Sequence, residues 1–238
     1  MNSFSFHWNR LLLYVCILLS SSSLYSQKKD QKDQEKQYLS EAKKDVLEYL
    51  SDTVIIKKYG IISNAIWSYA ELGMQEFKSS ALLIKTLEDE GFIIEKGVAG
   101  MPTCFVATWG NGKPVIGILG EYDALPGLSQ KANKPIRDPV VTGAPGHGCG
   151  HNMMGTAGVS AAIAVKKSME QNNLQGTLKF YGSPAEETLI SRPYMVREGV
   201  FNDVDAVIDN HASSSLSTSY GVAGNAVISV VFSFKGKT

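Results

Sequence analysis

Residues 115–123, VIGILGEYD, join a short apolar run to two carboxylates. The run Val115 to Leu119 is typical of a strand that is buried on both faces of a sheet. Glu121 and Asp123 follow at its carboxyl end. On either side, segments with helical spacing alternate with other short apolar segments. This alternation predicts an α/β fold in which a mostly parallel sheet is sandwiched by helices.

The remaining elements follow from residue spacing and turn signals. Helices are predicted over residues 38–69, with a break at Gly60, and over residues 76–90, 152–169 and 194–198. Further strands are predicted over residues 92–95, 103–109, 176–181, 206–208 (buried) and 226–234 (exposed or at an edge). The pair Asn111-Gly112 predicts a hairpin between strand 103–109 and strand 115–119.

The composition excludes some classes of protein. The 238 residues are 44% hydrophobic and 19% charged, which is typical of a globular domain with a sizeable core. Lys+Arg and Asp+Glu number 23 each, so the chain lacks the basic surplus of a nucleic-acid-binding protein. Cys16, Cys104 and Cys149 lie in very different contexts, which argues against a disulfide framework.

The first 26 residues are interpreted as a secretory signal peptide. Arg10 supplies positive charge, the apolar run 11–19 is too short to span a bilayer, and small residues precede an expected cleavage after Ser26. A membrane anchor and a buried helix are the alternatives. We expect an exported protein, periplasmic or secreted, that leaves the membrane after cleavage. Residues 27–37 form a charged lead-in.

Polar residues gather after the predicted strands and in the loops beyond them. The clusters are Glu121/Asp123, Cys149/His151, Glu186/Glu187 and Asp209/His211. In open α/β sheets, ligand sites form outside the carboxyl ends of the strands, so these clusters are expected to reach one crevice. Together they supply thiol, imidazole and carboxylate ligands, which predicts a divalent metal site. Zinc and manganese both remain open, as does the number of ions.

The paired glutamates suit two different roles. Neighbouring residues point in different directions, so one carboxylate can bind a metal while the other faces a water molecule. A metal lowers the pKa of that water, and a carboxylate base takes its proton. The pattern therefore indicates metal-assisted amide hydrolysis. For Asp123, a turn or helix cap is the alternative role.

These motifs resemble those of a known family. The motifs are GEYDALPG (residues 120–127), GHGCGHN (146–152), GSPAEE (182–187) and DNH (209–211). They resemble the metallo-aminoacylase/carboxypeptidase superfamily, and within it the amidohydrolase branch of the p-aminobenzoyl-glutamate hydrolase subunits and the indole-acetyl-amino-acid hydrolases. The segment IWSYAELGMQE, residues 66–76, is similar to the p-aminobenzoyl-glutamate type in particular.

The resemblance implies a role for each site residue. The implied metal ligands are Cys149, His151, Glu187 and His211. Glu186 matches the general base, which activates water and passes its proton to the leaving amine. Asp123 matches an aspartate that supports a metal-binding histidine. Glu121 falls where many relatives carry a histidine ligand, a replacement that the amidohydrolase branch shares in kind, so Glu121 is not assigned as a ligand. His147 matches no ligand position and is interpreted as a supporting or structural residue.

The resemblance also divides the chain. It implies an incomplete catalytic domain of the zinc-exopeptidase type over residues 38–221 and the first strand of an α+β lid and dimerisation domain over residues 222–238. In relatives, a segment like residues 230–238 leads into an Ala-His-Ala motif whose histidine stabilises the oxyanion. We therefore expect an amino-terminal part of a longer enzyme that forms a homodimer or a related hetero-oligomer.

The expected function is that of a metal-dependent amidohydrolase. Its implied substrates are N-acyl or N-aroyl amino acids of the aminobenzoyl-glutamate kind, with dipeptides as an alternative. A second alternative is a catalytically inactive metal-binding fragment of such an enzyme. A third is an exported structural or solute-binding protein, which would leave the four implied metal ligands unexplained together.

Overall fold

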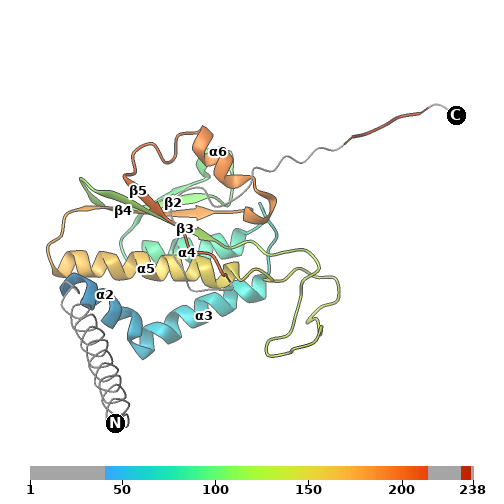
Figure 1. Ribbon diagram of the computed structural model, residues 1–238, viewed down its shortest axis with the longest axis horizontal. Coiled ribbons are helices and arrows are strands. Elements are labelled where there is room, and N and C mark those ends of the chain that lie inside the picture. Colours follow the sequence, from blue (N-terminus) through green and yellow to red (C-terminus); the bar gives the residue numbers. More distant parts are fainter. Residues whose placement is uncertain (1–40, 214–231, 237–238) are drawn as a thin grey trace, which may run out of the picture.

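The computed structural model describes residues 41–213 and 232–236, which form a sheet with helices on both faces (Figure 1). The strands are β1 (Ile93–Lys96), β2 (Phe105–Asn111), β3 (Val115–Glu121), β4 (Gly176–Ser183) and β5 (Ala206–Ile208). Their order across the sheet is β1-β2-β4-β3-β5. The α/β class and the covered sheet agree with the expectation from the sequence.

The sheet is mixed, so the prediction of a mostly parallel sheet is wrong. Strand β4 is parallel to β3, and β3 is parallel to β5, whereas β1 and β2 add to the sheet in antiparallel pairings. Val115 pairs with Thr177 and Glu121 with Ser183, so β3 and β4 end side by side. The carboxyl ends of β3, β4 and β5 therefore meet at one edge of the sheet, as the predicted crevice requires.

The predicted hairpin between β2 and β3 is also wrong. A tight turn follows β2, with Gly112 in the left-handed region at φ 76°, but the two strands do not pair with each other. Strand β4 lies between them and pairs along its length with both, from Gly176 to Gly182 with β2 and from Thr177 to Ser183 with β3. Strand β4, which begins more than fifty residues after β3 ends, thus takes the place beside β2 that the hairpin would have given to β3.

Four helices cover one face of the sheet. They are α2 (Glu41–Ser51), α3 (Thr53–Tyr69), α4 (Phe77–Glu88) and α5 (His151–Gln171). The first break falls at Asp52, whose carboxylate accepts a hydrogen bond from the Val54 N–H at 2.7 Å, and not at Gly60 as predicted. An N-cap side chain sets a helix boundary, whereas a single glycine inside a helix costs only about 1 kcal/mol.

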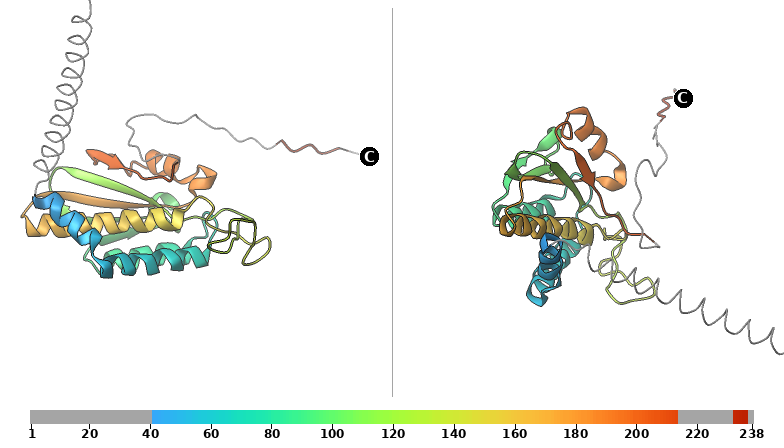
Figure 2. Two further views of the ribbon diagram at one scale, coloured as in Figure 1. Left: turned by 60° about the horizontal axis from the view of Figure 1, so that its bottom comes forward. Right: turned by 60° about the vertical axis from the view of Figure 1, so that its left-hand side comes forward.

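The hydrophobic core has two parts, one on each face of the sheet. The larger part lies under α3, α4 and α5 and includes the fully buried Ile66, Leu83, Ile163 and Phe180. The smaller part lies under the 3₁₀ turn η1 (Val98–Gly100) and helix α6 (Ser191–Arg197) on the opposite face (Figure 2). Burial on both faces holds the central strands β3 and β4 rigidly, and the site is built on their ends.

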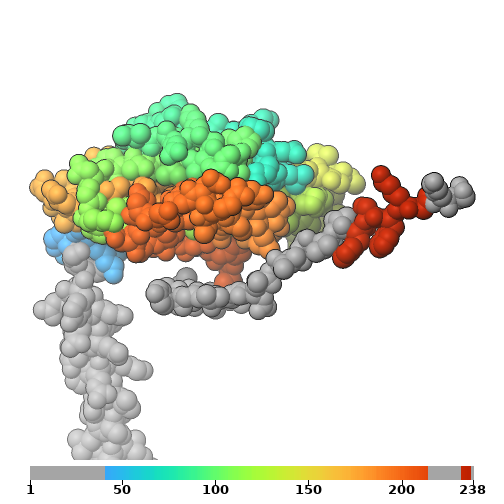
Figure 3. All heavy atoms as spheres, turned by 90° about the horizontal axis from the view of Figure 1, so that it is seen from above, coloured from blue at the N-terminus to red at the C-terminus, as the bar shows by residue number. Residues whose placement is uncertain are grey.

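Strand β5 is exposed, contrary to the expectation that residues 206–208 are buried. Val207 and Ile208 are 39% and 58% exposed, because β5 is an edge strand with no partner beyond it among the described residues. Helix α6 and the neighbouring segments, in orange, form much of the surface on this side of the molecule (Figure 3).

Several sequence-based expectations lie outside the described residues. These are the signal peptide (1–26), the charged lead-in (27–37), the boundary at residue 222 and most of the strand predicted over residues 226–234. Residues 232–236 are described and have no regular secondary structure. None of the helices in the described ranges is long and apolar enough to cross a membrane.

Candidate metal centre

The candidate metal centre is built where β3 ends and α5 begins. Glu121 is the last residue of β3, and His151 is the first residue of α5. Gly150, at the N-cap of α5, has a φ of 88°, a conformation that glycine adopts without strain. A Cβ at Gly155 would lie 2.4 Å from the Glu121 carbonyl oxygen, so only glycine lets α5 pack this closely against the end of β3. This close packing places His151 beside the strand end.

Asp123 fixes the orientation of the His151 ring. The His151 Nδ1 lies 2.9 Å from Asp123 Oδ1, and both side chains are buried. Because the carboxylate accepts, Nδ1 carries the proton and Nε2 offers a lone pair. Burial opposes ionisation of Asp123, but its hydrogen bonds with His151 and with the Glu187 N–H at 3.1 Å lower its pKa. Burial likewise opposes the charged form of His151, yet Asp123 and Glu121 raise its pKa overall.

Three carboxylates approach the free nitrogen of His151. Their distances to Nε2 are 3.1 Å from Glu121 Oε2, 3.7 Å from Glu186 Oε2 and 3.9 Å from Glu187 Oε1. Within the described part of the chain, His151 Nε2, Glu121 Oε2 and Glu187 Oε1 are buried atoms without a hydrogen-bond partner. Buried polar atoms are rarely left unpartnered, and acceptors that face one another need a cation or a proton between them. These residues therefore fit a divalent metal ion.

Cys149 and His211 complete the cluster from the more exposed side. The Cys149 Sγ lies 3.3 Å from His211 Nε2, and the rings of His151 and His211 are 5.8 Å apart between centroids. His211 Nδ1 donates to the Ala212 carbonyl at 2.9 Å, so its Nε2 also offers a lone pair. Two sets of ligand atoms lie within 4.8 Å of one another: Cys149, His151 and His211, and Glu121, His151, Glu186 and His211.

The thiol of Cys149 needs a cation to ionise at neutral pH. Burial and the nearby carboxylates, Glu187 foremost, raise the pKa of Cys149 to about 11. A thiolate is the form that binds metals, and a metal displaces the thiol proton when it binds. Cys149 is therefore suited to metal binding rather than to acting as a free nucleophile.

Arg192 lies behind the cluster and had no predicted role in the site. Its guanidinium group contacts Glu121 Oε1 and lies 3.3 Å from Asp209 Oδ2. Burial raises the pKa of Glu121, and the positive charges of Arg192 and His151 oppose that rise. Arg192 thus offsets part of the negative charge of the cluster. It also links Glu121, at the end of β3, to Asp209, which follows β5 and lies two residues before His211.

The structure gathers all the predicted site residues at one edge of the sheet. Asp123, Cys149, His151, Glu187 and His211 all take part in the contacts described above. Sequence reasoning set Glu121 aside as a ligand, whereas the structure places its free oxygen closer to His151 Nε2 than either oxygen of the paired glutamates. Two signals in the sequence pointed to Glu121: its position at the end of β3, and its match to a histidine ligand of many relatives. The contact with His151 itself is not local in sequence.

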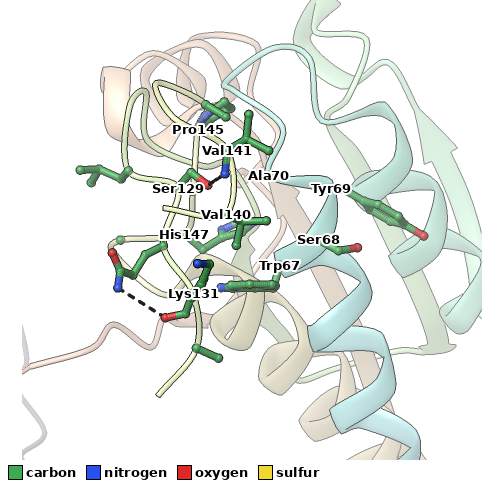
Figure 4. Close-up of a pocket in the computed structure, with 16 residues that line it drawn as sticks. Trp67, Ser68, Tyr69, Ala70, Ser129, Lys131, Val140, Val141, Pro145 and His147 are labelled. Carbon is green, nitrogen blue, oxygen red and sulfur yellow. Dashed lines mark hydrogen bonds between the residues drawn. The ribbon is translucent and has the colours of Figure 1, made fainter. Parts of the chain in front are cut away.

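A mostly apolar cavity of about 490 Å³ lies between the end of α3 and the β3–α5 connection. In Figure 4, Trp67 from α3 lies close to Val140 and Lys131 from the connection. The lining extends to His147, which immediately precedes the Gly148-Cys149 part of the cluster. His147 Nε2 donates to the Ile66 carbonyl at 3.1 Å, and burial lowers the pKa of His147. The residue is therefore a neutral link between the cavity wall and α3.

Comparison with known proteins identifies the family. Residues 117–230 match peptidase family M20/M25/M40. The chain belongs to this family. Over 155 residues it is 49% identical to a subunit of the p-aminobenzoyl-glutamate hydrolase of Escherichia coli (strain K12), a match that covers 65% of this chain and 32% of that protein. The resemblance inferred from the motifs is thereby confirmed.

Other known proteins match the chain in sequence and in structure. The chain is 30% identical over 169 residues to the Xaa-Arg dipeptidase of Mus musculus, covering 66% of this chain and 35% of that protein. It superimposes on the Bacillus subtilis YXEP protein, a dinuclear metal binding peptidase from the M20 family, with a TM-score of 0.57 and 26% identity, over 70% of this chain and 45% of the other. The chain spans about a third of the length of these curated relatives.

Proposed function

We propose that the chain carries the metal centre of a metal-dependent amidohydrolase of peptidase family M20. The observation that supports this most strongly is the set of buried, unpartnered acceptor atoms around His151 Nε2. The proposed ligands are Cys149, His151, Glu187 and His211, whose atoms converge from the segments that follow β4 and β5 and from the start of α5. Imidazole, thiolate and carboxylate together suit zinc, and the carboxylates also suit manganese.

The residues of the centre have separate roles in amide hydrolysis. When bound, the ion lowers the pKa of a water molecule and polarises a carbonyl group. Glu186 takes a proton from the attacking water and delivers it to the leaving amine, because its carboxylate faces the same point as His151 Nε2. Asp123 keeps the His151 proton on Nδ1, so that Nε2 stays available as a ligand.

The centre suits one or two ions. The two sets of ligand atoms share His151 and His211, and the second set adds Glu121 as a further ligand beside Glu186, the proposed base. The B. subtilis relative is described as dinuclear, which supports a second ion here as well. Elemental analysis of protein dialysed against zinc or manganese gives the stoichiometry directly, and Glu121→Gln is expected to reduce a value of two to one.

The proposed substrates are N-acyl or N-aroyl amino acids. The similarity to the p-aminobenzoyl-glutamate hydrolase of E. coli supports an aroyl amino acid, and the cavity beside Trp67 has the apolar lining that such a group requires. Dipeptides are the second candidate, which the similarity to Xaa-Arg dipeptidases supports. Hydrolysis of p-aminobenzoyl-glutamate, N-acetyl amino acids and Xaa-Arg dipeptides, compared at equal concentration, distinguishes the two.

Glu186→Gln tests the proposed mechanism. We expect kcat to fall by about 10²–10⁴, the range that a general base contributes, while the bound zinc or manganese stays the same. Glu198→Gln is the matched control, because Glu198 is a surface carboxylate paired with its neighbour Arg197. An unchanged rate in Glu186→Gln contradicts the mechanism. Metal binding without turnover in the unaltered chain favours the metal-binding fragment.

Export and assembly are further proposals. The apolar run within residues 1–26 supports export to a periplasm or the outside, and Edman sequencing of secreted protein that begins at Gln27 is the expected result. For the full-length protein we propose a homodimer or related hetero-oligomer, for which light scattering gives the mass.

A further inference from the structure

Glu76 is a fully buried carboxylate outside the metal cluster. Its side chain is 0% exposed, although no lysine, arginine or histidine pairs with it in the described part of the chain. Instead, Oε1 accepts a hydrogen bond from the Ala185 N–H at 2.8 Å, and Oε2 accepts one from the Thr103 hydroxyl at 2.8 Å. Burying a carboxylate is costly unless its hydrogen bonds are satisfied, so these two contacts require an explanation.

Helix capping does not explain Glu76. The residue occupies the N-cap position of α4, yet its side chain makes no capping hydrogen bond. Glu71 caps the helix in its place, because its carboxylate accepts from the Lys78 N–H at 2.9 Å and the Ser79 N–H at 2.8 Å. With the helix end already satisfied, the Glu76 carboxylate is turned away from α4 and toward the end of β4.

The partner of Glu76 is the residue that begins the glutamate turn, defined here as residues 185–187. Ala185 is buried and adopts the left-handed conformation, with φ 52° and ψ 42°. A residue other than glycine is held in this region at a cost of about 1–2 kcal/mol, so its surroundings must enforce the conformation. Gly73 leaves room for this residue, because a Cβ at position 73 would lie 2.9 Å from the Ala185 Cβ.

Two carboxylates therefore hold the glutamate turn from either side of Glu186. Glu76 accepts from the Ala185 N–H, and Asp123 accepts from the Glu187 N–H at 3.1 Å. Between these anchors, the carboxylates of Glu186 and Glu187 reach to 3.7 and 3.9 Å from His151 Nε2. The direction of both side chains is thus set by the backbone that the two anchors fix.

We propose that Glu76 is a positioning residue, which fixes the glutamate turn so that Glu186 and Glu187 face His151. The part of this proposal that concerns catalysis rests on the proposed function, since it assigns the base to Glu186. The structural part does not, since it concerns only the Ala185 N–H and the Glu76 carboxylate. The two parts can therefore be tested separately.

Hydrogen exchange tests the structural part without any need for turnover. In Glu76→Ala the Ala185 N–H loses its acceptor, and we expect exchange in a peptide covering residues 184–188 to speed up by about tenfold or more, with α5 still protected. In Glu76→Gln, the amide oxygen can still accept from the Ala185 N–H, and the amide NH₂ can donate to the Thr103 hydroxyl oxygen. We therefore expect exchange close to that of the unaltered protein. Because glutamine also keeps the side-chain volume, Glu76→Met separates the two roles: it keeps the volume without an acceptor, so we expect exchange close to that of Glu76→Ala, whereas a purely packing role predicts exchange close to that of the unaltered protein.

Glu71→Ala is the matched control. It removes a carboxylate from the same segment and uncaps α4, but it leaves the Ala185 hydrogen bond in place. We expect faster exchange in α4 and unchanged exchange in the glutamate turn. Thr103→Val is the milder variant should Glu76→Ala fail to fold. Thr103→Val removes only the hydrogen bond to Glu76 Oε2. We expect exchange in the glutamate turn to increase, but by less than in Glu76→Ala.

Zinc binding and turnover test the catalytic part. With Glu76→Ala at saturating zinc, we expect kcat to fall by about 10- to 100-fold with little change in KM, the usual effect of losing a residue that orients active-site groups. Glu76→Gln is expected to restore most of that loss.

The outcomes separate this inference from the proposed function. If Glu186→Gln abolishes hydrolysis while Glu76→Ala matches the unaltered protein in exchange and in kcat, the positioning role is overturned and the function stands. If the unaltered chain hydrolyses none of the substrates but Glu76→Ala still frees the glutamate turn, the positioning role stands and the function fails. Equal exchange in Glu76→Gln and Glu76→Ala also overturns the positioning role.

Discussion

The metal centre has a buried half and an open half, and the two are held in different ways. The buried half, Glu121, Asp123 and His151, belongs to β3, its end and α5, and its side chains are at most 2% exposed. The open half is Cys149 and His211. His211 is exposed and follows the exposed strand β5. Among the described residues, it forms hydrogen bonds with Cys149 and with the carbonyl of the next residue alone.

This difference separates stability from metal affinity. The buried half is fixed by the core whether or not an ion is bound, because Asp123 holds His151 through Nδ1 and Arg192 contacts Glu121. The side chains of the open half contact mainly each other, so a bound ion would fix their positions. We therefore expect substitutions in the buried half to change the free energy of unfolding of the metal-free protein, and substitutions in the open half to change mainly the affinity for metal.

The largest expected effect comes from His151→Ala. Removing this ring takes the Nδ1–H donor from the buried Asp123 carboxylate and empties the space of a fully buried side chain. Breaking a buried pair in this way destabilises by about 3–5 kcal/mol. Urea unfolding of the metal-free protein in a chelator measures the loss. A loss below about 1 kcal/mol would show that the buried half is not held by this contact.

Acid should weaken the buried half through Asp123. Burial opposes ionisation, but hydrogen bonds with His151 and Glu187 lower the pKa of Asp123 below its ordinary value of 3.8. A carboxyl group with a lowered pKa contributes stability above its unfolded pKa, and that stability is lost as the pH falls through 3.8 toward the folded value. We expect the metal-free protein to lose stability on this account below about pH 4.

Asp123→Asn isolates this effect. The variant lacks the titrating group, so its stability should fall less steeply with acid than that of the unaltered protein. Asp138→Asn is the control, because Asp138 forms a half-exposed pair with Lys131 at 2.7 Å, and such pairs contribute only about 0–1 kcal/mol. Parallel acid profiles for Asp123→Asn and the unaltered protein would rule out the linkage.

The sequence predicted what depends on local pattern. Helical spacing located α4 and α5 within a few residues, and the apolar run at Val115 located β3. The pairing of β2 was missed, because Asn111-Gly112 signals only that the chain turns. Which strand lies beside β2 depends on β4, whose residues bury side chains on both faces of the sheet. A strand of that kind is more stable at the centre of the sheet than at its edge.

The sequence likewise predicted part of the site and missed the rest. Residue types and strand ends were enough to gather Asp123, Cys149 and His151 into one centre. The roles of Glu76 and Arg192 depend on contacts that cross more than seventy residues, from Glu76 to Ala185 and from Arg192 to Glu121. A glutamate before a helix predicts a cap, and only the placement of Glu71 frees Glu76 for another partner.

The smallest expected effect on the metal-free protein comes from His211→Ala, which tests the open half. His211 is exposed, and its hydrogen bonds to described residues are limited to its own segment and Cys149. We therefore expect a change within about 0.5 kcal/mol in the free energy of unfolding. Zinc should separate the variant from the unaltered protein. A tenfold weaker affinity reduces the stabilisation at a fixed zinc concentration by about 1.4 kcal/mol. If His211→Ala weakens the metal-free protein as much as His151→Ala does, the two halves are one unit. If it binds zinc as the unaltered protein does, His211 is not a ligand.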